Sequence, residues 1–127
     1  MPPARPEYPQ HEASWSVKQS SAMAWTILIA AAFCEIGWAI GLKYTVGFTR
    51  LWPSLWTGLA LVASVGLLAV AARTLPIGTA YAVWTGIGAA GTALLGVWLF
   101  HEPATAARLA CIGLIVAGVI GLKLVSP

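Results

Sequence analysis

Four long stretches of the chain consist almost entirely of apolar residues, and short polar connections separate them. Each stretch holds about 20 residues, the number that an α-helix needs to cross about 30 Å of hydrocarbon at 1.5 Å per residue. The sequence therefore predicts an all-α membrane protein with four transmembrane helices, at about residues 23–42, 51–72, 75–100 and 104–122.

The connections between the predicted spans are short enough to make neighbouring helices antiparallel, and an even number of spans places both termini on one side. Lysine and arginine give almost no preference for one orientation. One side would carry four of these residues and the other three. A chain without an orientation bias can insert both ways, so we expect two oppositely inserted copies to pair as an antiparallel, dual-topology homodimer. The first side holds Arg5, Lys18, Arg73 and Lys123, and the second holds Lys43, Arg50 and Arg108.

Residues 1–22 differ in composition from the rest of the chain. They are polar and contain four of the eight prolines. This composition is typical of a disordered or loosely ordered tail, and Glu7 and Glu12 offset the basic residues that a secretory leader would need. We therefore expect residues 23–127 to form the transmembrane domain.

The overall composition excludes an ordinary soluble domain. Hydrophobic residues make up 59% of the chain and charged residues 9%, whereas soluble domains carry about 25% charged residues. The net charge of +3 does not indicate nucleic acid, because the seven basic residues are dispersed and form no patch. Cys34 and Cys111 lack the spacing of metal ligands, so we expect structural thiols, no metal and no cofactor.

Glu35 is the one acidic residue well inside a predicted span. An ionised side chain at the bilayer centre costs about 2.5–3.5 kcal/mol on insertion scales. Carboxylates retained in such places generally serve function, and this one is expected to bind and release a proton or exchange it for a cation. The structural alternative is a permanently protonated group that is bonded to a neighbour.

Aromatic residues share helix faces near this carboxylate. Trp38 follows Glu35 by three residues, and Tyr81, Trp84 and Thr85 have the spacing of one face of the third span. Aromatic faces hold organic cations, and indole and phenol groups donate hydrogen bonds. The alternative is a belt of interfacial aromatics, which suits the tryptophans nearer the span ends. These are Trp25, Trp52, Trp56 and Trp98.

Ser64 lies midway along the second span. Its hydroxyl can hydrogen-bond a carboxylate, although a serine in a span more often bonds to the backbone of its own helix.

Small residues recur in the third and fourth spans. Gly86 and Gly88 permit a bend of the third helix, with close helix packing as the alternative. Gly113, Ala117 and Gly121 recur every four residues, which is the pattern of close helix contact in membranes. That contact can form within one chain or between two copies.

The sequence contains no nucleophile–base pair, phosphate-binding loop or metal cluster, and His101 stands alone in a connection. We therefore expect the protein not to be an enzyme. Two function classes remain open from the residues: a transporter that uses Glu35, and a small membrane subunit that scaffolds a partner and moves nothing.

Four strings carry a resemblance to a known family: FCEIGWAIGLKY, GFTRLWPS, RTLPIGTAYAVWTGIGA and GLIVAGVIGLKL. From Met23 to its end, the chain resembles the small multidrug resistance family of four-helix, proton-coupled exporters. Within that family it is similar to the guanidinium-exporter subtype, because Trp38 stands where multidrug members usually have a small residue. Ala32 departs from the glycine that is common in the subtype.

The resemblance implies a proton/guanidinium antiporter of the bacterial inner (plasma) membrane that also takes small substituted guanidines. The runner-up is an exporter of quaternary ammonium and other hydrophobic cations. The family implies an antiparallel dimer whose two central glutamates share one site, with the lipid bilayer as its surroundings. Carried over by position, Glu35 would bind protons and substrate. Trp38, Ser64, Tyr81 and Trp84 would line the site, Gly86 and Gly88 would lie at a kink, and Gly113, Ala117 and Gly121 would form the dimer contact.

Overall fold

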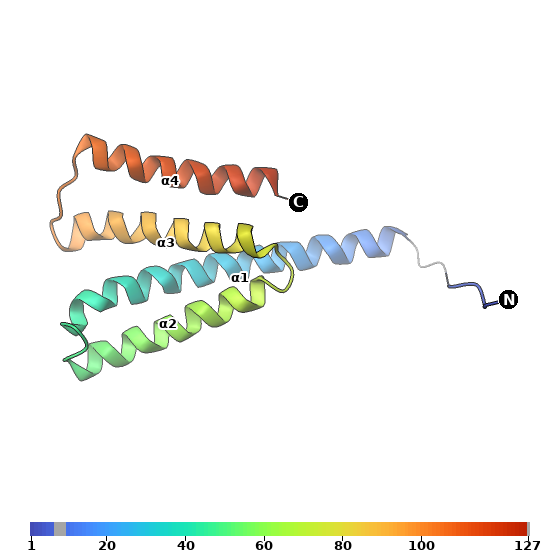
Figure 1. The fold of residues 1–127 in the computed structure, drawn as a ribbon, viewed down its shortest axis with the longest axis horizontal. Helices are drawn as coiled ribbons and strands as arrows, with labels where there is room; N and C mark the ends of the chain where they lie inside the picture. The colour runs from blue at the N-terminus through green and yellow to red at the C-terminus, as the bar shows by residue number, and fades with distance from the viewer. Residues whose placement is uncertain (7–9, 127) are drawn as a thin grey trace.

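The computed structural model describes the backbone of residues 1–6 and 10–126, and the side chains of residues 1–6 and 18–126. Its secondary structure consists of four α-helices, each antiparallel to the next, and both ends of the chain lie at the same end of the bundle (Figure 1). All four helices are long and apolar enough to cross a membrane. The predicted all-α fold with four spans is thereby confirmed. The helices are α1 (Gln10–Thr45), α2 (Leu51–Ala71), α3 (Ile77–Leu99) and α4 (Ala106–Val125).

Helix α1 begins further upstream than the first predicted span. Residues 10–22 are helical, where we expected a loosely ordered tail, and residues 7–9 of that tail lie outside the described part of the chain. No proline occurs between Gln10 and Thr45, so every residue can donate its backbone N–H to the helix. The stretch of α1 that is suited to the membrane is Lys18–Thr45.

Threonine side chains cap two of the helix ends. At the end of α1, the Thr45 hydroxyl donates to the carbonyl of Leu42 at 2.7 Å and accepts from the backbone N–H of Phe48 at 3.1 Å. At the start of α4, the Thr105 hydroxyl accepts from the backbone N–H of Arg108 at 3.2 Å. Such caps satisfy backbone groups that have no partner inside the helix. They allow the short connections that hold neighbouring helices together.

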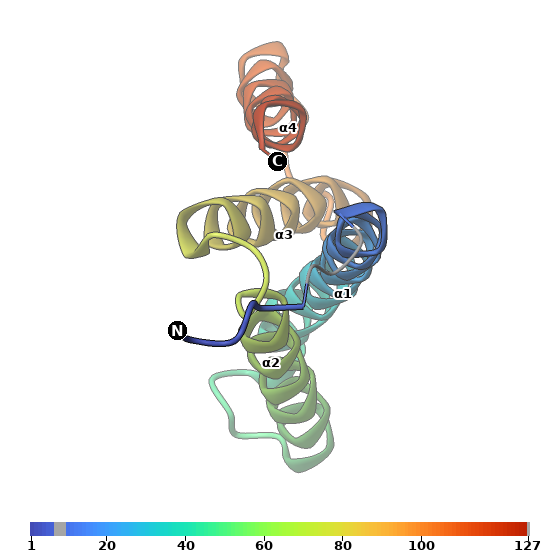
Figure 2. The same cartoon turned by 90° about the vertical axis from the view of Figure 1, so that its right-hand side faces the viewer.

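Within the described chain, α3 packs against all three other helices and α1 against α2 and α3, whereas the backbone of α4 approaches that of α3 alone. Figure 2 shows α4 set apart from α1 and α2. Glycines permit the close approaches. A Cβ atom at Gly41 would lie 2.4 Å from the Thr57 hydroxyl oxygen on α2, and one at Gly91 would lie 2.3 Å from Cδ1 of Ile36 on α1. Close contact through small residues is the usual basis of helix association in membranes.

The buried core lies toward the end of the bundle that holds the termini. It joins the first half of the membrane-crossing part of α1 to the end of α2 and the start of α3. Beyond Glu35 the packing between α1 and α3 opens into a cavity. The core residues are Ala24, Trp25, Leu28, Ala31, Ala32, Leu68, Ala71, Leu75, Ala80, Val83 and Trp84.

Candidate functional site

A cavity of about 550 Å³ lies between α1 and α3 and reaches the connection between α3 and α4. Both glutamates of the region face it, together with two basic side chains. Most of the remaining lining residues are small, which leaves room for a solute. The lining consists of Glu35, Ala39, Ile40, Lys43, Thr85, Gly88, Ala89, Thr92, Ala93, Gly96, Phe100, Glu102 and Arg108.

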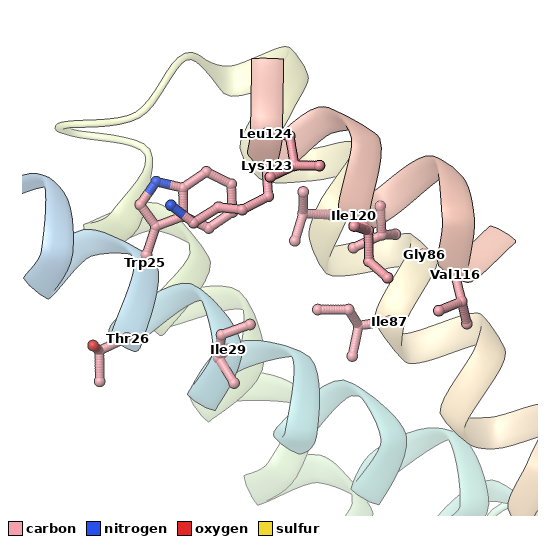
Figure 3. A pocket seen from close by; sticks show the side chains of 11 residues that line it. Trp25, Thr26, Ile29, Gly86, Ile87, Val116, Ile120, Lys123 and Leu124 are labelled. Atoms are coloured by element: carbon pink, nitrogen blue, oxygen red, sulfur yellow. The ribbon is translucent and has the colours of Figure 1, made fainter. Parts of the chain in front are cut away.

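A second cavity, of about 490 Å³, lies between α1, α3 and α4 (Figure 3). Of its eleven lining residues, only Thr26 and Lys123 carry a polar group besides the Trp25 indole. The Lys123 ammonium lies 4.3 Å from the centroid of the Trp25 ring. Since this cavity is apolar and has no carboxylate in its lining, the cavity that holds Glu35 is the candidate site.

The Glu35 carboxylate is held by a neighbour on its own helix. The Trp38 indole Nε1 donates a hydrogen bond of 2.6 Å to Oε2 of Glu35. Residues three apart lie on the same helix face, so this contact follows directly from the sequence spacing. Among the described residues, no donor contacts the second carboxylate oxygen, Oε1. That oxygen is therefore available to a proton or to a ligand that donates a hydrogen bond.

Ser64 connects α1, α2 and α3 beside this carboxylate. Its hydroxyl accepts from the Trp84 indole N–H at 2.8 Å, and lies 2.8 Å from the carbonyl oxygen of Ala31 and 3.5 Å from Oε2 of Glu35. A hydroxyl has one hydrogen to donate, and the shorter distance assigns it to Ala31. Ser64 is fully buried. It orients Trp84 and contacts the backbone of α1 instead of the backbone of its own helix.

The predicted lining residues divide into two groups. Glu35 faces the cavity, and Trp38 and Ser64 contact its carboxylate without lining the cavity themselves. Tyr81 and Trp84 lie together, with ring centroids 5.6 Å apart and planes at 50°. Trp84 is buried, whereas Tyr81 is 55% exposed on the surface of this chain. Trp84 therefore reaches the site through Ser64.

The two glycines predicted to bend α3 both lie at close contacts in a helix that runs unbroken from Ile77 to Leu99. A Cβ atom at Gly88 would lie 2.3 Å from Cγ of Glu35, and one at Gly86 would lie 2.5 Å from Cγ2 of Val119 on α4. Gly88 thus makes the space in which the Glu35 side chain lies. This role was not predicted, because no local sequence signal pairs a glycine on α3 with a glutamate on α1. The kink stays a prediction.

The small-residue stripe of α4 has no neighbour within the described chain. Cβ atoms at Gly113 and Gly121 would meet nothing within 4 Å, and Ala117 is exposed. Of the residues of α4, only Ile112 is buried. Packing within the chain therefore does not account for the stripe.

Residues 23–115 match the protein-family model described as Small Multidrug Resistance protein. The chain belongs to this family. A guanidinium exporter of Yersinia pseudotuberculosis serotype I (strain IP32953) is 62% identical over 104 residues, which are 82% of this chain and 100% of the relative. Relatives from Citrobacter freundii and Salmonella typhimurium, also named guanidinium exporter, are each 60% identical over 102 residues, which are 80% of this chain and 97% of the relative.

Membership of the small multidrug resistance family explains the exposed apolar surface. The chain is a multi-pass membrane protein, so large side chains such as Trp52, Trp56 and Trp98, each at least 70% exposed, face lipid or a membrane interface. The resemblance inferred from the four sequence strings is confirmed. The part of the site that sequence reasoning missed is the mouth of the cavity, where Glu102 and Arg108 meet.

Proposed function

We propose that this protein is a proton-coupled antiporter that exports guanidinium and small substituted guanidines. The observation that carries the proposal is the carboxylate of Glu35, which lies within a membrane-crossing helix and faces a cavity of about 550 Å³. The naming of relatives at 60–62% identity as guanidinium exporters supports the choice of substrate.

The chemistry of the site suits a guanidinium ion. Guanidinium is planar and weakly hydrated, and its N–H groups form a fixed fork that matches a carboxylate. Oε2 of Glu35 already accepts from Trp38, so Oε1 is the oxygen to which a ligand would donate. The Trp38 bond also fixes the orientation of the carboxylate before the ligand arrives. A fixed acceptor loses less freedom on binding than a mobile one.

Coupling follows from competition for one group. When Glu35 is protonated it carries no charge and attracts a cation only weakly. When guanidinium occupies the carboxylate, the proton has to leave. Proton entry from one side then drives guanidinium exit to that side, because the two ligands exclude each other.

We propose that two copies assemble as an antiparallel, dual-topology homodimer in which both Glu35 side chains face a shared site. The nearly equal numbers of basic residues on the two sides support insertion in both orientations. The unpaired stripe at Gly113, Ala117 and Gly121 is available to a second copy. The residues predicted to line the site but turned away from this chain's own cavity, such as Tyr81, would then face the partner. The bacterial origin of the relatives supports the inner (plasma) membrane as the location.

The decisive experiment compares Glu35→Gln with Glu35→Asp in proteoliposomes. A proton gradient with the acidic side inside the vesicle should drive guanidinium uptake by the unmodified protein. The apparent affinity for guanidinium should weaken as the pH falls, because protons compete for Glu35. Glu35→Gln should lose coupled transport, whereas Glu35→Asp should retain a reduced, pH-dependent rate because it keeps the carboxylate. Robust pH-driven guanidinium transport by Glu35→Gln would refute the proposal.

A further inference from the structure

The cavity that holds Glu35 has a second carboxylate at its other end. Glu102 lies in the connection between α3 and α4, and its carboxylate is paired with the guanidinium group of Arg108. The distance from Nη2 of Arg108 to Oε2 of Glu102 is 2.5 Å, and each side chain is 35% exposed. The pair is thus open to solutes that enter the cavity from this side.

The two carboxylates are placed by the same face of α3. A Cβ atom at Gly96 would lie 2.6 Å from Oε2 of Glu102, just as one at Gly88 would lie 2.3 Å from Cγ of Glu35. Positions eight residues apart share a helix face, and they are separated by about 12 Å along the axis. Each acidic side chain therefore lies over a glycine, at two points along one wall of the cavity.

The wall between these two glycines has small residues and an unused polar group. Ala89, Thr92 and Ala93 line the cavity there. The Thr92 hydroxyl oxygen is buried and has no hydrogen-bond partner within residues 18–126. A planar cation that moved along the wall would find an acceptor midway between Glu102 and Glu35.

The loop holds Glu102 in place independently of Arg108. His101 has a positive φ of 54°, and this left-handed residue turns the chain back onto α3. The backbone N–H groups of Phe100 and Glu102 both lie near the carbonyl oxygen of Gly96, at 3.0 and 3.4 Å. The carboxylate position over Gly96 is therefore a property of the loop.

Arg108 is held less firmly than its partner. It lies in the first turn of α4, where the helix dipole disfavours a positive charge. One nitrogen contacts the carboxylate, so the pair is not the two-pronged arrangement that makes arginine–carboxylate contacts strong. The other cation at this end, Lys43, lies 5.2 Å from the centroid of the Phe100 ring and forms no ion pair in the described structure.

The geometry points to Glu102 as a second binding site for a guanidinium cation, at the mouth of the cavity, where Arg108 is a resident occupant that an incoming guanidinium displaces. Arg108 carries the same functional group as the ligand, so exchange replaces one carboxylate–guanidinium contact with another and leaves the Glu102 carboxylate paired. The site then serves as the station between the surface and Glu35. This inference rests on the proposed function, since it assigns the outer step of the same transport route.

The test follows the side chain of Arg108 by NMR in the purified protein in lipid nanodiscs, with ¹⁵N-labelled arginine and an Arg108→Ala sample to identify the signal. Guanidinium chloride should shift the Arg108 side-chain signal, and sodium chloride at the same ionic strength should not. The shift should persist in Glu35→Gln, which lacks the inner carboxylate. An Arg108 signal that does not move, or that moves equally with sodium chloride, would overturn the inference.

Transport kinetics provide a second test, which distinguishes a binding role of Glu102 from an ion pair that only stabilises the loop. Glu102→Gln should raise the KM for guanidinium by up to about fivefold, the upper end of the range expected for one exposed charge contact. Arg108→Ala should lower the KM, because it vacates Glu102. A pair that only fastens the loop would instead raise the KM or lower the rate in both variants, and that result would overturn the inference. If the unmodified protein transports no guanidinium, the proposed function fails, whereas the NMR titration still decides whether Glu102 binds the ion.

Discussion

The contact between Gly88 and Glu35 gives the sharpest test of the site geometry. Substituting alanine at Gly88 adds one methyl group, whose carbon would lie 2.3 Å from Cγ and 3.3 Å from Cβ of Glu35. Carbon atoms pack at about 3.5–4.0 Å, so Cγ of Glu35 would have to move by more than about 1 Å. The carboxylate would then leave the position in which Trp38 donates to it at 2.6 Å.

The size of the effect follows from that hydrogen bond. A hydrogen bond to a charged group contributes about 1.5–3 kcal/mol, and each 1.4 kcal/mol corresponds to about a factor of ten. A displacement of about 1 Å at a reacting group can likewise cost about 100-fold in rate. We therefore expect Gly88→Ala to lower the rate of pH-driven guanidinium transport about 10-fold to 100-fold, while the protein still inserts and folds.

The matched control is Gly78→Ala on the same helix, where an added Cβ atom would meet nothing within 4 Å. Both substitutions raise helix propensity by a similar amount, so their difference isolates the contact with Glu35. The assay is guanidinium uptake into proteoliposomes at equal protein content, with circular dichroism to verify helix content. Equal transport rates in the two variants would refute the claim that Gly88 seats the carboxylate.

Two further outcomes test the packing and the assembly. Ser64→Ala should destabilise the protein by about 1–3 kcal/mol in thermal unfolding, because the buried Trp84 indole N–H would lose its acceptor. The control is Ser54→Ala, which removes only a local bond to the carbonyl of Arg50 and should change the stability little. Equal melting temperatures of the two variants would contradict the role of Ser64 as the acceptor for Trp84. For the proposed dual topology, a cysteine introduced at Ser126 in a background without Cys34 and Cys111 should react with an impermeant maleimide to about half in intact cells and fully after permeabilisation, whereas all-or-none labelling in intact cells would refute it.

Much of this protein follows from local pattern alone. The four membrane-crossing helices are predictable because apolar length is read directly against the thickness of the bilayer. Glu35 is conspicuous because it interrupts an apolar run. Its bond to Trp38 is predictable from a spacing of three residues within one helix.

Contacts between helices, in contrast, could not be predicted from the local sequence pattern. The chain has 13 glycines, and the sequence does not distinguish the ones that receive a neighbour from the ones that face open space. Gly88 and Gly96 seat the two carboxylates, whereas Gly78 and Gly113 meet nothing within 4 Å. The difference depends on the register and crossing of α1, α3 and the loop after α3, which many small packing contacts set together.

By itself, then, the sequence determined how many times the chain crosses the membrane and which acidic residue would lie inside, because both depend only on the order of polar and apolar residues along the chain. Only the tertiary structure decided that Glu102 and Arg108 share a cavity with Glu35, and that α4 packs against α3 with its small-residue stripe uncovered. Glu35 and Glu102 are 67 positions apart in the chain. They face one cavity because the interhelical packing of α1 and α3 brings them there, and no local periodicity encodes that packing.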